Sequence, residues 1–158
     1  MVAVSNSTPL IALSKIGKLN LLHEYFDQIS IPKAVYDEVV VNGGLLYGAK
    51  EVAEADWIIV ENVGNLLAVE SLSVYLGAGE SEAIVLAKEK DCILIIDDGD
   101  GRKAASNMNM DIIGTVGILS KAGKDCKIDL RDSLDELNAC GFRLSDKVKD
   151  LILSKVED

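Results

Sequence analysis

Three aspartates gather where a strand-like run of the sequence ends. The stretch CILIIDDGDGR places Asp97, Asp98 and Asp100 directly after five residues that are typical of a buried strand. Like charges at this spacing repel one another, so they need either open solvent or a bound cation. Taken alone, Asp97 and Asp98 also suit a simple turn before Gly99. The rest of the sequence is needed to decide between a cation site and a solvent-exposed turn.

Two glutamates and one asparagine share this pattern of polar groups at strand ends or in apolar surroundings. Glu38 lies within AVYDEVV and Glu82 within GESEAIVLA, and both segments have mostly apolar, helical patterns. Asn6 follows the strand-like run VAVS. Burying an unpaired carboxylate is costly, so such positions invite a ligand. Their oxygens suit Mg²⁺ or Mn²⁺, and such an ion can activate water for attack on a phosphate.

Each of these residues also has an ordinary structural interpretation. Glu38 could face solvent, and Asn6 could be a turn residue before a helix. Glu82 and its neighbour Glu80 could be first-turn acids that the helix dipole favours. The lone His23 has no partner in the sequence and is assigned to the surface. The hypothesis of a metal site therefore depends on the pattern that these residues share.

Strand-like and helical segments alternate along the whole chain. The expected strands are 2–5, 28–31, 57–63, 92–96 and 110–114. The expected helices are 9–16 (with Thr8 as its cap), 19–26, 32–40, 50–56, 77–90, 101–108, 115–124, 130–140 and 146–156. The strands are continuously apolar, which favours a parallel sheet covered on both faces. The sequence predicts a single domain, 1–158, with a three-layer α/β/α fold around a central, mostly parallel sheet. Active groups should lie beyond the carboxyl ends of its strands.

Composition limits the possible partners and compartments. The chain has 158 residues and a net charge of -10, so it has no general attraction to nucleic acid. No apolar run approaches the roughly 20 residues of a membrane span, and no secretory signal is visible. Cys92, Cys126 and Cys140 are far apart and form no CxxC pair. We therefore expect a cytoplasmic protein without a membrane, a disulfide or a zinc site.

Other phosphate-binding and metal-binding classes lack the residues they need. DDGDG is similar to a late stretch of haloacid-dehalogenase-type phosphatases, but Asn6 stands where that chemistry needs a nucleophilic Asp. An EF-hand alignment puts Ile96 at the first position and Asn107 at the twelfth, and neither suits Ca²⁺. The sequence contains no GxGxxG and no GK[ST] motif.

Six blocks, in order, resemble a prokaryotic subgroup of the PIN-domain family. They are VSNSTPLIALSKIGKLNLL, IPKAVYDEV, LGAGESEAIVLAKE, LIIDDGDGRKAA, IIGTVGILSKA and LDELNACGFRLS. Together they cover nearly the whole chain. The resemblance implies a PIN-like fold and a metal-dependent nuclease, usually acting on RNA. Many members of the family are toxins of type II toxin–antitoxin pairs.

The resemblance also implies which residues form the site. The expected catalytic acids are Glu38, Glu82 and Asp98. The expected ligands of Mg²⁺ or Mn²⁺ are these three together with Asn6 and Asp97, with Glu80 close by. Thr8 and Thr115 are expected polar neighbours of the site that contact the RNA substrate. Arg102 is expected to contact its phosphate because Arg102 and Lys103 are the nearest basic residues in sequence. A solvated helix face is the alternative interpretation of the two basic residues.

Asn6 departs from the family, which usually has Asp at this position. An Asn oxygen can coordinate a cation, but it brings no negative charge and cannot accept a proton. Two functions therefore stay open: a ribonuclease with a weakened acidic site, or an inactive PIN-fold module that binds RNA or a protein partner. The resemblance further implies a homodimer and a small antitoxin protein as a partner.

Overall fold

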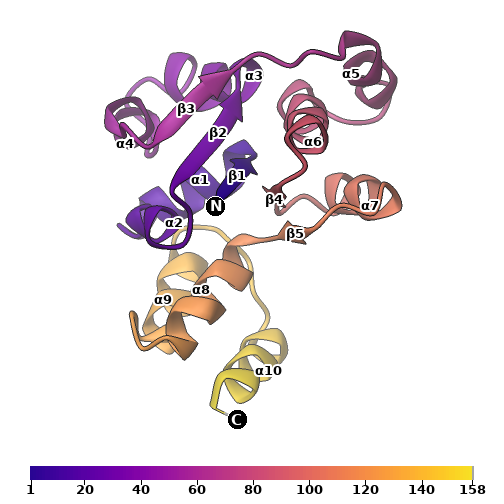
Figure 1. Cartoon of the computed structure of the whole chain (residues 1–158). Coiled ribbons are helices and arrows are strands. Elements are labelled where there is room, and N and C mark those ends of the chain that lie inside the picture. Colours follow the sequence, from indigo (N-terminus) through magenta and orange to yellow (C-terminus); the bar gives the residue numbers. More distant parts are fainter. Residues whose placement is uncertain (158) are drawn as a thin grey trace.

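A parallel five-stranded sheet forms the centre of the molecule. The structure is a computed structural model that describes residues 1–157. Its strands are β1 (Val2–Ser5), β2 (Gln28–Pro32), β3 (Ile58–Glu61), β4 (Ile93–Ile95) and β5 (Ile112–Ile113). Every neighbouring pair is parallel, and the spatial order is β3-β2-β1-β4-β5 (Figure 1). The predicted parallel sheet is thereby confirmed.

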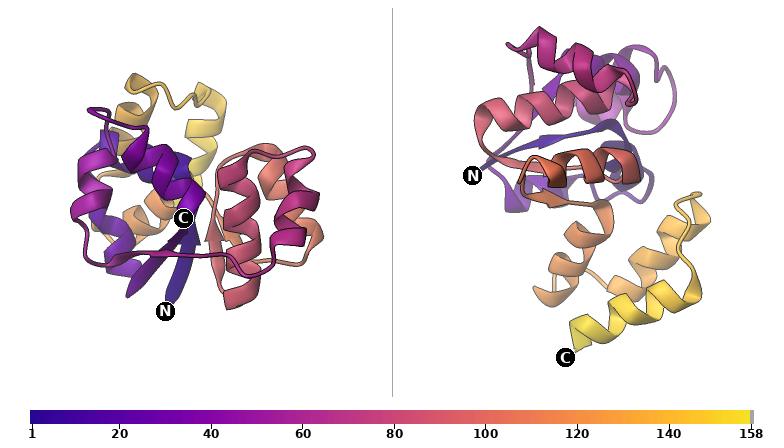
Figure 2. Two further views of the ribbon diagram at one scale, coloured as in Figure 1. Left: turned by 90° about the horizontal axis from the view of Figure 1, so that it is seen from above. Right: turned by 90° about the vertical axis from the view of Figure 1, so that its right-hand side faces the viewer.

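Helices cover both faces of the sheet. They are α1 (Ser7–Lys15), α2 (Asn20–Tyr25), α3 (Lys33–Tyr36), the π-helix η1 (Asp37–Val41), α4 (Ala49–Glu54), α5 (Leu66–Ser73), α6 (Ala78–Lys90), α7 (Gly99–Asn107), α8 (Thr115–Lys124), α9 (Leu130–Ala139) and α10 (Asp146–Glu157). On one face α6 packs on β1, β2 and β4, with α3 and α7 beside it and α5 against its outer side. The other face carries α1, α2 and α8, and α9 and α10 pack on α8 (Figure 2). The three-layer α/β/α fold is confirmed.

The apolar runs of the sequence account for this layering. Side chains such as Ile29, Ile31, Leu94 and Ile95 are completely buried, as expected for strands covered on both faces. Within the described residues, no helix combines the length and the apolar character that crossing a membrane requires.

The strand order contains a switch point between β1 and β4. From β1 the chain moves to β2 and β3 on one side, and later to β4 and β5 on the other side. At such a point the connections leave in opposite directions, which opens a crevice beyond the carboxyl ends of the two strands. The residues that follow β1 and β4 therefore share one edge of the sheet, called here the acidic edge.

Several expected boundaries differ from the observed ones. Helix α1 begins at Ser7 with Asn6 as its cap residue, so the prediction of Thr8 as cap is wrong. The Asn6 N–H donates to the carbonyl of Ile95 (2.9 Å), so the chain turns into the helix directly after its last sheet bond. Pro32 is the last residue of β2 and the cap residue of α3, which begins at Lys33 and not at Pro32. Helix α5 is absent from the expected elements, and its apolar residues, such as Leu66 and Leu67, are exposed.

Candidate active site

Asn6 follows the carboxyl end of β1, and Asp97 and Asp98 follow the carboxyl end of the neighbouring strand β4. Ser5 is paired with Ile95 in the sheet, so the residues that follow each strand leave the sheet side by side. Asn6 is almost fully buried, with 3% of its surface exposed. Its side chain makes no capping hydrogen bond to α1. Asn6 therefore occupies the cap position of α1 without using its side-chain amide for capping.

Glu38 is held at the acidic edge by two neighbours from other elements. Its Oε2 accepts a hydrogen bond from the Ser7 hydroxyl (2.5 Å), and its Oε1 accepts one from the Gly79 N–H (3.1 Å). A Cβ atom at position 79 would lie only 2.5 Å from Oε1, so a residue without a side chain is needed there. The bonds to Ser7 and Gly79 connect η1 with the starts of α1 and α6. Glu38 is thus fixed in position although its side chain is largely exposed.

The π-helical turn at Glu38 separates it from its neighbour Asp37. The N–H of Asn42 donates to the Asp37 carbonyl (2.7 Å), five residues earlier, as in a π-helix. Such turns occur often at functional sites. Asp37 pairs with Lys33 (3.1 Å) within its own helical segment, whereas Glu38 contacts α1 and α6. Only the second of the two acids therefore belongs to the acidic edge.

Glu80, at the start of α6, is a further acidic residue at this edge. Burial raises the pKa of its carboxyl above the ordinary value, and the negative charges of Asp98, Glu38 and Asp100 raise it further. A hydrogen bond from the backbone of Gly77 acts in the opposite direction. The charged form of Glu80 is thus disfavoured by three other carboxylates. A cation placed among them would offset this repulsion.

Asp98 and Asp97 have different surroundings although they are adjacent. Asp98 is exposed and uses Oδ2 to accept a hydrogen bond from the Gly101 N–H (2.9 Å), which caps α7. Asp97 accepts two hydrogen bonds from Thr115, one from its N–H (2.7 Å) and one from its hydroxyl (2.6 Å). Asp97 therefore anchors the start of α8 with both of its oxygens. Asp98 keeps more of its coordinating capacity.

Glu82 contacts a different part of the molecule. Its Oε1 accepts a hydrogen bond from the Ala34 N–H (3.3 Å) at the start of α3. Together with Lys33 and Asn62 it lines a separate cavity of about 360 Å³. Two positions along an α-helix correspond to a rotation of roughly 200°, so Glu80 and Glu82 leave α6 on different sides. The charges of Asp98 and Glu38 thus act on Glu80, while the hydrogen bond of Glu82 is to the start of α3.

Two of the three residues expected to contact substrate, Thr115 and Arg102, lie close together, because a Cβ at Gly114 would lie 2.8 Å from Asp97 Oδ1 and 2.9 Å from Arg102 Nη1. Thr8 is exposed and lines a cavity with Lys15 and Phe142. Thr115 is fully buried and bonded to Asp97. Arg102 donates from Nη1 to the carbonyl of Ile96 (2.8 Å), so its guanidinium braces the turn after β4.

Comparison with known proteins identifies the fold family. The model of the PIN-domain family DUF3368 matches residues 2–158. The chain belongs to the PIN-domain family. A solved structure of a PilT N-terminus domain protein from the hyperthermophilic archaeon Sulfolobus solfataricus P2 is similar in fold, with a TM-score of 0.54. The two chains are 21% identical over 77% of this chain and 93% of the other. No curated protein matches the chain significantly.

Membership confirms the predicted PIN-like fold and gives a coarse function. PIN domains are generally nucleases and typically use divalent metal ions. The carboxylate oxygens of Glu38, Glu80 and Asp98 are hard ligands of the kind that Mg²⁺ and Mn²⁺ prefer. Within residues 1–157, however, no three His, Cys, Asp or Glu side chains are close enough together to hold an ion. The donor chemistry of this PIN domain thus fits, while binding would require its carboxylates to turn toward one another.

The sequence interpretation missed two residues that shape the site. Ser7 and Gly79 position Glu38, and neither has chemistry of its own that draws attention. A signal for Gly79 exists, because a glycine inside the first turn of a helix often marks a close approach by another group. For Ser7 the only signal is its position directly after Asn6.

Proposed function

We propose that this PIN domain is a divalent-metal-dependent endoribonuclease. In this proposal Glu38, Glu80 and Asp98 hold Mg²⁺ or Mn²⁺, and Asn6 is a neutral neighbour. The observation that carries the proposal is that η1, α6 and the end of β4 each place a carboxylate at one edge, where the charges of Asp98 and Glu38 act on Glu80. Glu80 takes the role that the sequence resemblance gave to Glu82.

The chain's own residues have distinct tasks in this proposal. A divalent ion, when bound, polarises a phosphodiester and lowers the pKa of a water molecule. Glu38 is preorganised, because Ser7 and Gly79 hold both of its oxygens. The raised pKa of Glu80 makes this group ready to bind a proton or a cation. Asp97 supports the site indirectly, because it fixes α8 through Thr115.

A pair of variants on one helix tests the proposal. Cleavage of single-stranded RNA is measured with Mn²⁺, with Mg²⁺ and with a chelator. Glu80→Gln should reduce the cleavage rate roughly 100-fold, as expected for the loss of a metal ligand. Glu82→Gln, two residues away, should stay close to the wild-type rate. The melting temperature of Glu80→Gln in chelator should not fall, because the substitution removes a repelled charge.

Two outcomes would contradict this assignment. If Glu82→Gln abolishes cleavage and Glu80→Gln does not, the role returns to Glu82. If both variants cleave like the wild type, the site lies elsewhere.

A non-catalytic RNA-binding or protein-binding module is the second candidate. The observation that favours it is Asn6, a neutral residue at a position where the family usually has Asp. This candidate predicts no cleavage and no rise in melting temperature at millimolar Mn²⁺. The nuclease proposal predicts the opposite, because an ion bound to the native state raises the melting temperature by mass action.

We also propose, on the family resemblance alone, that the protein is a cytoplasmic toxin acting as a homodimer with a small antitoxin. The free thiols of Cys92, Cys126 and Cys140 are compatible with a reducing compartment. A short neighbouring reading frame whose product suppresses cleavage would support the proposal. An isolated gene would contradict it.

A further inference from the structure

A cavity of about 410 Å³ lies beside the acidic edge, over one face of α7. It is lined by Tyr75, Asp100, Lys103, Ala104 and Asn107. The last four have the spacing i, i+3, i+4 and i+7, so they share one side of the helix. Its volume falls in the range of cavities that hold small organic ligands.

Two side chains that line this cavity, Tyr75 and Lys103, are not engaged in aromatic or ionic contacts within the described part of the chain. Tyr75 lies in the turn between α5 and α6, and 63% of its surface is exposed. Within the described part of the chain its ring stacks on no other aromatic ring and meets no cation. The exposed Lys103 forms no ion pair there. Ala104, with 8% of its surface exposed, has a short side chain that leaves space in the cavity.

Position connects the cavity to the acidic edge. Helix α7 begins directly after Asp98, which caps it. Asp100 lines the cavity and is also one of the charges that act on Glu80. Helix α6, which carries Glu80, lies between α5 and α7 (Figures 1 and 2). A chain molecule with a phosphate at the acidic edge could therefore place its next unit in the cavity.

The chemistry of the lining fits a nucleotide. A flat, exposed phenol ring is a stacking platform for a nucleobase. Lys103 is a cation in a chain whose net charge is -10, so it provides a local contact for a phosphate. The Asn107 amide carries both a donor and an acceptor for a base edge. Stacking on Tyr75 requires a base that is out of a duplex.

We propose that this cavity is a base-binding subsite for single-stranded RNA. The base of a nucleotide next to the cleaved phosphate stacks on Tyr75, and Lys103 contacts a neighbouring phosphate. The inference rests on the proposed nuclease function and names the form of substrate that the acidic edge receives.

Binding in the presence of chelator tests the subsite without cleavage. The affinity of a fluorescent single-stranded RNA oligonucleotide is measured by anisotropy. Tyr75→Ala should weaken binding roughly 10-fold, in the range found for the loss of one stacked base. Tyr75→Phe keeps the ring and should bind like the wild type. Tyr47→Ala is the matched control, because Tyr47 has 61% of its surface exposed and lies outside the cavity.

A second pair of variants tests the phosphate contact. Lys103→Ala should weaken binding and reduce the slope of log affinity against log salt by about one charge. Lys124→Ala, which removes an exposed cation from α8, should change neither. A duplex of the same sequence should bind Tyr75→Ala and the wild type equally.

The outcomes separate the subsite from the nuclease function. If the wild type cleaves RNA but Tyr75→Ala binds it unchanged, the subsite is overturned and the nuclease proposal stands. If nothing is cleaved but binding depends on Tyr75, the subsite stands and the nuclease proposal falls. Equal losses in Tyr75→Ala and Tyr47→Ala would also overturn the subsite.

Discussion

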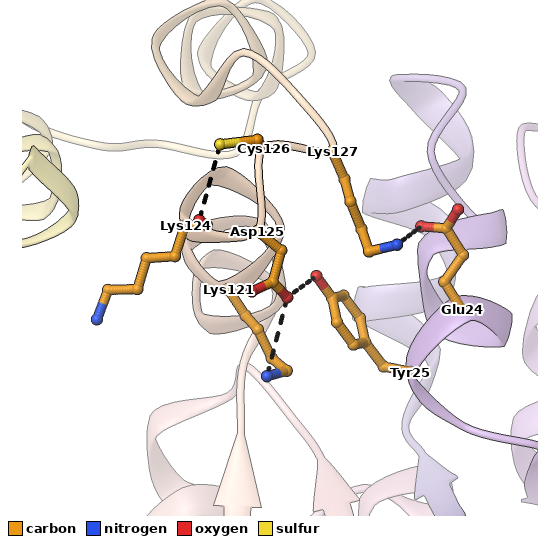
Figure 3. A network of polar contacts seen from close by, with 7 residues as sticks. All are labelled: Glu24, Tyr25, Lys121, Lys124, Asp125, Cys126 and Lys127. Carbon is orange, nitrogen blue, oxygen red and sulfur yellow. Dashed lines mark hydrogen bonds and ion pairs between the residues drawn. The ribbon is translucent and has the colours of Figure 1, made fainter.

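Carboxylates have opposite surroundings in two regions of this molecule. Between α2 and α8, Asp125 accepts a hydrogen bond from the Tyr25 hydroxyl (2.8 Å) and pairs with Lys121 (4.0 Å). Lys127 pairs with Glu24 (3.7 Å), and the Nζ atoms of Lys121 and Lys127 lie 5.1 and 5.9 Å from the centre of the Tyr25 ring (Figure 3). Each negative charge in this network therefore has a positive neighbour.

At the acidic edge the charges are not matched. Within residues 1–157, Glu38, Glu80 and Asp98 take part in no ion pair, and the charges of Asp98 and Glu38 raise the pKa of Glu80. A matched surface network adds modestly to stability. An unmatched one costs stability and is expected where a protein binds a ligand of opposite charge. The difference separates carboxylates that add modestly to stability from carboxylates whose mutual repulsion a bound cation would offset.

Gly79→Ala should have the largest effect on the acidic edge. The new methyl carbon would lie 2.5 Å from Oε1 and 2.7 Å from Oε2 of Glu38, so the carboxylate must leave its position. Alanine is the better helix former by roughly 0.5–1 kcal/mol, so the fold should be retained. We expect the Mn²⁺-dependent cleavage rate to fall roughly 100-fold, with a melting temperature equal to or above that of the wild type.

Gly77→Ala is the matched control for this substitution. A Cβ atom at position 77 has no neighbour closer than Glu80 Oε1, at 3.6 Å, which is an ordinary contact. Its cleavage rate should therefore remain near the wild-type value. Equal rates for Gly79→Ala and the wild type would show that the position of Glu38 does not matter for catalysis.

Asn6→Asp would increase the imbalance of charge at the same edge. Position 6 is buried and follows the strand next to β4, so a new carboxylate there should repel those already present. We expect a lower melting temperature in chelator, a larger rise on adding Mn²⁺, and faster RNA cleavage. If Asn6 only shapes the turn into α1, Asp should change none of these quantities. Equal metal-induced shifts in both proteins would contradict a shared site.

Local patterns of the sequence were sufficient to predict much of this architecture. Short segments rich in apolar, β-branched residues identified β1, β2 and β4, because strands buried on both faces favour apolar side chains. Polar residues directly after such runs identified Asn6 and Asp98 as residues of the sheet edge. The apolar helical surroundings of Glu38 singled it out, and the family resemblance then assigned it, and not its neighbour Asp37, to the site.

Features that depend on the approach of distant segments could not be predicted in this way. Glu80 and Glu82 are both acids near the start of α6, and only the packing of α6 on the sheet determines which one faces Asp98. The role of Gly79 depends on the position of η1, some 40 residues earlier in the chain. Arg102 looks available for phosphate in sequence, but the turn after β4 brings the Ile96 carbonyl within reach of its guanidinium.

Tyr25→Phe tests the matched region and should have the smallest effect. Burial and the hydrogen bond to Asp125, together with the charges of Asp125 and Glu24, raise the pKa of Tyr25 from 10.0 to about 12. Because the folded state favours the protonated phenol, this stabilisation is complete below pH 10 and disappears as the pH rises toward 12. Removing the hydroxyl should lower the free energy of unfolding by about 0.5–1 kcal/mol at pH 8, a shift of roughly 1–4 °C in melting temperature. The difference between variant and wild type should shrink in thermal scans above pH 10, whereas Tyr47→Phe should show no difference at pH 8. A constant difference up to pH 12 would mean that the hydroxyl stabilises the fold by packing and not through its bond to Asp125.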